Sequence, residues 1–431
     1  MSDRLNILIL HQMGDPRTWR SSVRDIEYSL PDYAPEHNYI VHDASLPAPD
    51  FIKDIEYHCI ILGSTFLCNC HFPLMLSKTL KQYAFIKDSN AFKIAMPQDD
   101  YDCSAILERW LLDWNIDLLY TVCPQHWDVL YPNLALTKKI RLGYTGYVSD
   151  KMIERGRHLK PFESRTIDVS YRAAKLPPHF GVVGHLKGVI GDVFLANTSD
   201  EGFVVDISTH PKNIIHGDKW LDFIENSKFT LGSNSGSSLL DPEGEIRFKV
   251  ERYLAFNPKA TYEEVRDACF PMEDGKWIFT AISPRNIEAA LLGTVQICTP
   301  GSYSGIMFPE THYIPFEPDG SNIRDVVAMM RDTYKVKRIA AACKEAFLSV
   351  KELRYSYHVQ EIIDLITQGI STAKIVGTNT EEMKRLIQKY REYNKNYSKY
   401  FWPLRRLISS AKKVAVALGA RKVKYFFRQN R

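Results

Sequence analysis

Residues 283–322 carry side chains whose types and spacing suit a nucleotide. A helix is predicted to begin near Arg285, a strand follows from Val295, and the loop GSYSG leaves that strand. A helix N-terminus and a glycine-flanked loop let backbone amides approach a phosphate closely. The carboxylate of Glu288 can accept hydrogen bonds from both hydroxyls of a ribose, or it can simply complement the helix dipole. The candidate binding residues of this segment are Arg285, Glu288, Tyr303, Ser304 and Gly305.

A second polar loop, GSNSGSS, directly follows the apolar run 229–231. Its glycines let a ligand approach the backbone, so Ser233 and Gly236 are also candidate binding residues. A plain solvent-exposed turn has the same composition. Both interpretations of this loop stay open.

Residues 283–322 resemble the donor-binding signature of GT-B glycosyltransferases of the "glycosyl transferases group 1" kind, found in bacterial surface-polysaccharide loci and spore-coat maturation proteins. In that pattern a Glu followed by Ala, an apolar stretch, Gly and a buried strand contacts the donor ribose, and Glu288 occupies this place. Many retaining members carry another acidic residue eight positions earlier, where this chain has Thr280. The resemblance implies a hexosyltransferase and leaves retention or inversion open.

The same resemblance implies that an Arg and a Lys at the first strand–helix junction of the donor domain hold the diphosphate. The nearest matches are Arg172 and Lys187. A leaving nucleoside diphosphate gains charge as the glycosidic bond breaks, so fixed cations stabilise the transition state more than the ground state. We therefore expect no cofactor and no divalent metal to be required. The alternative is that both residues are surface charges.

Candidate proton acceptors follow two apolar runs near the N-terminus. His11 and Asp15 lie in the loop after 6–10, and Asp100 lies in the loop PQDDYD after 92–96. An inverting transferase needs a base for the acceptor hydroxyl, and each of these three side chains can serve. In a retaining enzyme they would only orient the acceptor.

Two short motifs could suggest a metal centre, and neither has the expected context. Cys68 and Cys70 lie near His58 and His71, but CxC is not a zinc-knuckle spacing and no second pair follows. The tripeptide 100–102 spells the DxD motif of the other glycosyltransferase fold. It lies in the wrong domain for donor binding, so we interpret it as acceptor-side or structural.

Alternating apolar runs and helical patterns indicate the elements that position these residues. Runs of this kind recur throughout the first 150 residues and again from about 166 to 316, as expected for two parallel sheets flanked by helices. Loops at the carboxyl ends of parallel strands line the ligand crevice. The predicted fold class is α/β, with two Rossmann-like domains facing across a cleft and a basic amphipathic helical tail.

The predicted domains are an acceptor-side domain at 1–160, a nucleotide-sugar domain at 161–372 and a tail at 373–431. The helical pattern at 355–367 could pack back on the first domain. From Met383 onward the chain has 15 Lys and Arg against one acidic residue, Glu392, so the remainder is net acidic. Apolar residues at helical spacing, including Leu404, Leu407 and Ile408, with Trp402, Phe426 and Phe427, favour binding to an anionic membrane surface.

Oligomer contacts are an alternative role for the tail, and nucleic acid is disfavoured because the rest of the chain would repel a phosphate backbone. No apolar run long enough to span a membrane and no signal-peptide core are present in the sequence. We expect a cytoplasmic protein, peripheral at the inner face of the cytoplasmic membrane, with a glycan or lipid-linked acceptor. The rival functions are a noncatalytic nucleotide-sugar-binding or assembly subunit and a nonhydrolysing sugar-nucleotide epimerase.

Overall fold

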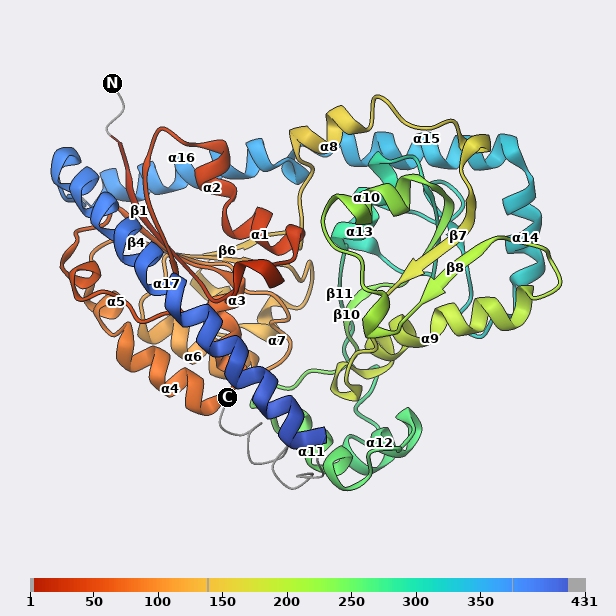
Figure 1. The fold of residues 1–431 in the computed structure, drawn as a ribbon, viewed down its shortest axis with the longest axis horizontal. Coiled ribbons are helices and arrows are strands. Elements are labelled where there is room, and N and C mark those ends of the chain that lie inside the picture. The colour runs from red at the N-terminus through yellow and green to blue at the C-terminus, as the bar shows by residue number, and fades with distance from the viewer. Residues whose placement is uncertain (1–3, 138, 374, 418–431) are drawn as a thin grey trace.

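Two parallel sheets form two α/β lobes in the computed structural model, which describes residues 4–137, 139–373 and 375–417, with side chains to 409 (Figure 1). The first sheet has the strand order β2-β1-β3-β4-β5-β6. Its strands are β1 (Asn6–His11), β2 (Asn38–Asp43), β3 (Cys59–Leu62), β4 (Phe92–Ala95), β5 (Leu118–Thr121) and β6 (Ile140–Leu142). The helices between and after them are α1 (Ser21–Glu27), α2 (Ser29–Tyr33), α3 (Ser64–Leu67), α4 (Pro73–Gln82), α5 (Phe85–Asp88), α6 (Ser104–Asp113), α7 (Trp127–Leu130) and α8 (Asp150–Arg155).

Side chains of the first sheet feed two separate apolar layers. Along β1, Leu8 and Leu10 pack into one layer, whereas Ile7 and Ile9 pack into the other. This alternation follows from the two-residue period of a strand, and burial on both faces explains why the strand is continuously apolar. The first lobe is therefore a doubly wound domain.

The second sheet is also parallel and has the order β13-β12-β9-β7-β8. Its strands are β7 (Ile167–Arg172), β8 (Val205–Ser208), β9 (Ser227–Gly232), β12 (Val295–Cys298) and β13 (Ile314–Pro315), beside the antiparallel ribbon β10 (Ser235–Ser237) and β11 (Phe279–Ala281). Its helices are α9 (Gly181–Thr198), α10 (Asp218–Glu225), α11 (Glu245–Phe256), α12 (Tyr262–Cys269), α13 (Pro284–Leu291), α14 (Ile323–Arg331) and α15 (Thr333–Ser349). The predicted fold class is confirmed.

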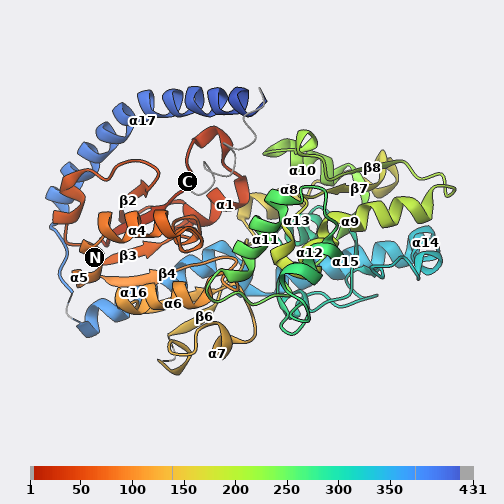
Figure 2. The same cartoon turned by 90° about the horizontal axis from the view of Figure 1, so that it is seen from below.

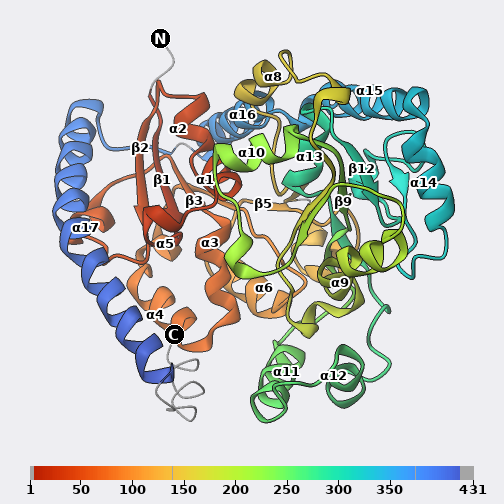
Figure 3. The same cartoon turned by 45° about the vertical axis from the view of Figure 1, so that its right-hand side comes forward.

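The last two helices, α16 (Tyr355–Ala373) and α17 (Thr380–Ala417), return to the first lobe (Figures 1 and 3). Val359, Ile362 and Ile366 of α16 join an apolar layer of the first sheet, as the helical pattern allowed. The predicted boundary at 372 is therefore wrong, because α16 buries its apolar face in the first domain.

Helix α17 shows that the predicted tail at 373–431 is not separate from the first domain. It runs beside β2 at the edge of the first sheet (Figure 3), and Met383 and Tyr390 are buried in the first domain's core. The Tyr390 hydroxyl lies 3.0 Å from His42 Nδ1 and donates to the Val41 carbonyl at 3.0 Å. The predicted interfacial residues Phe426 and Phe427 lie outside the described residues.

Helix α11 of the second domain lies between the two lobes when the molecule is seen from below (Figure 2). The Arg247 guanidinium of α11 pairs with Asp102, which follows β4, at 2.6 Å, and both side chains are largely buried. The Cys103 amide donates to the Asp241 carbonyl at 2.7 Å beside this pair. Backbone and ionic contacts therefore join the two lobes. None of the described helices combines the length and apolarity needed to cross a membrane.

Candidate functional site

The crevice of the second sheet lies where the strand order reverses, between β7 and β9. The chain leaves β7 for β8 on one side and reaches β9 and β12 on the other, so loops at the carboxyl ends of β7 and β9 diverge. Helices α9 and α13 and the loop after β9 border this crevice.

Arg285 is held at the first turn of α13. Ser283 caps this helix in a capping box with Asn286, and Pro284 fits the first helical position, so the helix start is firmly set. The guanidinium lies 5.8 Å from the Tyr171 ring centre and 5.3 Å from that of Trp220. Its Nε is buried without a hydrogen-bond partner among the described residues. A buried, unpaired donor of this kind is suited to an anion.

Lys187 of α9 faces the same crevice. Its Nζ donates to Ser235 Oγ at 3.3 Å, and no carboxylate of the described residues forms an ion pair with it. Burial, with a further contribution from Arg285, lowers the pKa of Lys187 to about 8. Lys187 and Arg285 thus lie close enough to influence each other's charge, and neither forms an ion pair among the described residues.

Glu288 lies near Arg285, one turn further along α13. Its Oε2 accepts a hydrogen bond from Trp220 Nε1 at 2.7 Å, which fixes the carboxylate. Burial raises the pKa of Glu288, and nearby Arg285 opposes that rise. One carboxylate oxygen is used by Trp220, and Oε1 is available for a ribose hydroxyl.

The two residues predicted in the loop after β9 have different environments. Ser233 is buried, and its hydroxyl has no hydrogen-bond partner in the described part of the chain. Gly236 has φ 137°, and a Cβ there would lie 1.9 Å from the Phe279 carbonyl oxygen. Gly236 is therefore required by the close pairing of β10 with β11, and its predicted contact with a donor is not supported by this geometry.

Tyr303, Ser304 and Gly305 form a tight left-handed turn after β12. The Tyr303 side chain is fully buried and its hydroxyl donates to the Thr299 carbonyl at 2.7 Å. Ser304 Oγ accepts from the Ile282 amide at 3.0 Å, and Gly305 has φ 75°. The prediction of Tyr303 as a binding side chain is corrected, because it belongs to the core.

The prediction that Arg172 holds the diphosphate is also corrected. Its guanidinium pairs with Asp206 Oδ1 at 2.7 Å and donates to the carbonyls of Tyr171, Asp206 and Asn213. The guanidinium thus joins β7 to β8 and to the loop after β8. Because it is occupied by these contacts, it is poorly suited to hold a diphosphate. Its neighbour in the prediction, Lys187, is the cation that stays unpaired.

The predicted bases of the first domain are poorly placed for that role. Asp100 is fully buried and accepts from Thr121 and from the Tyr131 hydroxyl, so it is structural. His11 is buried, and desolvation lowers its pKa to about 3, which makes it a weak base. Asp15 pairs with Arg406 of α17 at 2.8 Å and with Arg17 at 3.3 Å, and hydrogen bonds from both keep its pKa below the usual value.

Three charged residues of the first domain lie near this crevice instead. Arg20 and Asp99 contribute to the electrostatic environment of Lys187, and Asp25 contributes to that of Glu288. Asp99 is exposed, adopts φ 56° and accepts from the Tyr101 hydroxyl at 2.6 Å. The sequence signal for Asp99 was the pair Asp99-Asp100 after an apolar run. Of two adjacent side chains only one points into the core, and here it is Asp100.

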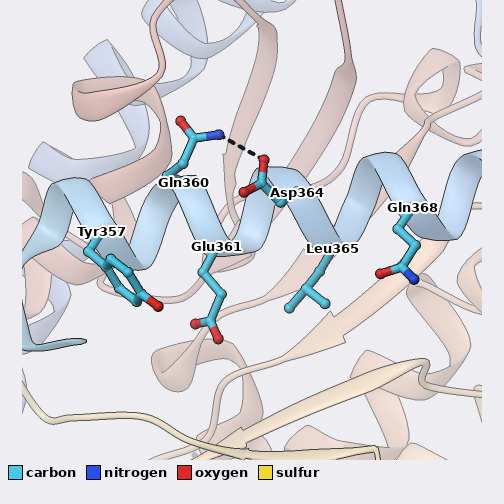
Figure 4. Close-up of a pocket in the computed structure, with 6 residues that line it drawn as sticks. All are labelled: Tyr357, Gln360, Glu361, Asp364, Leu365 and Gln368. Carbon is cyan, nitrogen blue, oxygen red and sulfur yellow. Dashed lines mark hydrogen bonds between the residues drawn. The ribbon is translucent and has the colours of Figure 1, made fainter. Parts of the chain in front are cut away.

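Thr280, in the place of an acidic residue, lines a small gap between the lobes. The gap is bordered on the other side by the loop after β5, including Gln125. A second, shallow pocket lies entirely along α16 (Figure 4). Its side chains come from one helix, with Gln360 donating to Asp364, so it does not gather groups from several elements. No group of three His, Cys, Asp or Glu among the described residues is arranged to hold a metal ion.

No protein-family model matches this chain, and no curated protein matches it significantly. Solved structures do match. An α-glucosyltransferase in complex with UDP and a DNA 13-mer containing an HMU base is 11% identical over 84% of this chain and 99% of its own, with a TM-score of 0.50.

Two further structures align over 85% of this chain at 10% identity. For a glycosyltransferase from Rickettsia africae the alignment covers 99% of its chain, with a TM-score of 0.47. For Anabaena HepE in complex with UDP-glucose it covers 100% of its chain, with a TM-score of 0.44. At such identities the comparison concerns architecture alone. This chain therefore has the GT-B glycosyltransferase fold of two facing Rossmann-like domains.

Proposed function

We propose that this protein is a glycosyltransferase that moves a sugar, in our expectation a hexose, from a nucleoside-diphosphate donor to an acceptor hydroxyl. The observation that carries the proposal is the pair of cations Lys187 and Arg285, which have no ion-pair partner among the described residues. Arg285 also lies near Glu288 at the crevice of the second sheet. Burying two neighbouring cations that form no ion pair costs free energy, part of which a bound diphosphate would recover.

The cations have a defined part in the proposed reaction. The acceptor oxygen forms the new bond to the anomeric carbon, the old carbon–oxygen bond breaks, and the electron pair leaves with the nucleoside diphosphate. Lys187 and Arg285 stabilise that developing charge, and the unpartnered Ser233 hydroxyl offers a further donor. Glu288 Oε1 accepts from the ribose. In this proposal no divalent metal or other cofactor is required.

On the acceptor side we propose Asp99, rather than Asp100, as the candidate base. Asp99 is exposed at the carboxyl edge of β4 and lies close enough to Lys187 to influence its charge. A carboxylate there could take the acceptor proton in an inverting reaction. We propose a glycan or lipid-linked acceptor of a bacterial surface polysaccharide.

The loss of an acidic residue at Thr280 favours a second candidate, a noncatalytic nucleotide-sugar-binding subunit. Thr280 lines the gap between the lobes and offers a hydroxyl where a carboxylate would act on the donor sugar. This candidate shares the binding site with the first and differs only in turnover.

A thermal-shift screen against UDP, GDP, CMP, dTDP and their common sugars tests donor binding. UDP and UDP-glucose come first, because similar folds bind them. At one hundred times Kd we expect about 2.7 kcal/mol of stabilisation, lost in Lys187→Ala and Glu288→Ala. Lys151→Ala is the matched control, since its side chain is 76% exposed and pairs with the equally exposed Asp218. No shift with any nucleotide would refute the proposed site.

Nucleotide release then separates the candidates. We expect slow release of nucleoside diphosphate from the identified donor sugar, unchanged by a chelator and reduced in Asp99→Asn. Binding without release under any acceptor mixture would favour the noncatalytic subunit. Conversion of the sugar without an acceptor would indicate an epimerase.

A further inference from the structure

The last described turns of α17 expose an apolar face. Tyr400, Leu404, Leu407 and Ile408 are 70%, 58%, 69% and 47% exposed. Their spacing of four, three and one places them on one side of the helix. Large apolar side chains that gather at the surface indicate an interaction site.

Positive charge surrounds this face. Residues 393–431 contain eleven Lys and Arg and no acidic residue. Among the described ones, Lys395, Lys399 and Arg405 are exposed, and Arg405 lies over the Phe401 ring at 5.2 Å. An anionic surface complements this composition.

The opposite side of α17 holds the loop after β1. Arg406 Nη1 lies 2.8 Å from Asp15 Oδ2, and Trp402 is buried against Gly14, where a Cβ would be 3.8 Å from the indole. The loop is thereby fixed to the helix that carries the apolar face. This loop opens at the carboxyl end of β1, on the acceptor side of the cleft.

We infer that the face formed by Tyr400, Leu404, Leu407 and Ile408 binds an anionic lipid bilayer. Aliphatic side chains gain free energy in the headgroup–acyl boundary, whereas a nucleic acid phosphate backbone offers them nothing comparable. Because Arg406 and Trp402 hold the loop after β1, docking places the acceptor side of the cleft at the membrane. The consequence that the acceptor is lipid-borne rests on the proposed function.

Flotation of the full-length protein with vesicles tests the docking face. We expect binding to vesicles of three parts phosphatidylcholine and one part phosphatidylglycerol, and at least tenfold weaker binding to phosphatidylcholine alone. The variant Leu404→Ser/Leu407→Ser/Ile408→Ser should bind the anionic vesicles at least tenfold more weakly than the wild type. The matched control is Leu136→Ser/Phe256→Ser/Met272→Ser, whose side chains are 83%, 77% and 87% exposed. Equal binding of both triple variants overturns the inference.

An environment-sensitive fluorophore tests the orientation. Attached at Leu404→Cys it should shift to shorter wavelength on anionic vesicles, and at Met272→Cys it should not; seven of the eight native cysteines are buried. A label at Thr18→Cys, on the loop after β1, should be quenched by headgroup-labelled lipid more than the Met272 label. Binding of duplex DNA or self-association through this face, without vesicle binding, overturns the inference. Vesicle binding needs no donor, so its failure is distinguishable from failure of the proposed function.

Discussion

Burial of a charged side chain lowers the stability of the folded protein, and a neighbouring cation such as Arg285 adds to this effect. Lys187 is the residue where this is most evident, because its pKa of about 8 lies below the ordinary 10.5. Between these values the unfolded chain binds a proton that the folded chain lacks. The destabilising contribution of Lys187 is therefore fully present below pH 8 and fades as the pH rises toward 10.5.

Nucleotide affinity should depend on pH in the opposite sense. The diphosphate needs the charged form of Lys187, so the Kd should rise about eightfold between pH 7.5 and 9.0 in the wild type. Lys187→Arg keeps its charge over this range and should give a flat profile. Isothermal titration calorimetry with the nucleotide from the thermal-shift screen measures both. Parallel profiles for the two proteins would show that Lys187 does not contact the diphosphate.

Arg172 should behave as a structural residue. Its guanidinium holds Asp206 and three carbonyls, so Arg172→Gln should lower the free energy of unfolding by about 2 kcal/mol. Urea denaturation measures this loss. The Kd for nucleotide, measured where the variant is folded, should change less than twofold. A tenfold loss of affinity with unchanged stability would restore the diphosphate-binding role predicted from the sequence.

The sequence could identify the loops that carry candidate residues but not which side chains are free. Arg172 ends β7 and Lys187 lies in the helix that follows it, and only the position of Asp206 on β8 decides which of them is paired. Likewise Asp99 and Asp100 are adjacent, and the partners Thr121 and Tyr131 bury one of them. Such choices depend on long-range contacts that a linear pattern does not contain.

At the scale of elements, the link between α11 and the loop after β4 joins the two lobes. Asp102 is 5% exposed and Arg247 16%, so removing one partner leaves a charge in a poorly solvated place. Arg247→Ala should destabilise the protein by about 3 kcal/mol and separate the thermal unfolding of the lobes into two transitions. Differential scanning calorimetry records both effects.

A neighbouring ion pair supplies the control for this link. Arg109 of α6 pairs with Glu243 at 2.7 Å across the same boundary, but these side chains are 61% and 48% exposed. Because solvent screens the pair, Arg109→Ala should cost less than about 1 kcal/mol. Similar losses for the two variants would mean that the burial of Asp102 is not what couples the lobes.

The elements themselves were largely predictable. Strands buried on both faces are continuously apolar, and the predicted run 6–10 and the strand predicted from Val295 coincide with β1 and β12 within one residue. The ribbon of β10 and β11 was not predicted, because β10 has the sequence SGS. Pairing of β10 depends on the absence of a Cβ at Gly236, which apolar periodicity does not reveal.

At the scale of the whole molecule, the chain crosses between the lobes twice, so the first domain is completed by the last helices. Composition suggested a detached basic tail, because the charge of α17 is obvious in the sequence and its buried residues are few. Met383 and Tyr390, seven positions apart, lie on one face and pack into the core built from the first 140 residues. One helix therefore combines a structural first half with an exposed, apolar and basic end.

Graded truncation separates these two roles. A chain ending at 379 lacks Met383 and Tyr390, and exposing that part of the core should cost the first domain about 4–6 kcal/mol. A chain ending at 398 keeps both and loses only Trp402, Arg406 and the exposed face, so its loss should be about 1–2 kcal/mol while vesicle binding disappears. Urea denaturation and flotation measure the two quantities. Equal stabilities would contradict the structural role, and vesicle binding by the longer truncation would contradict the docking role, because each depends on a different half of the helix.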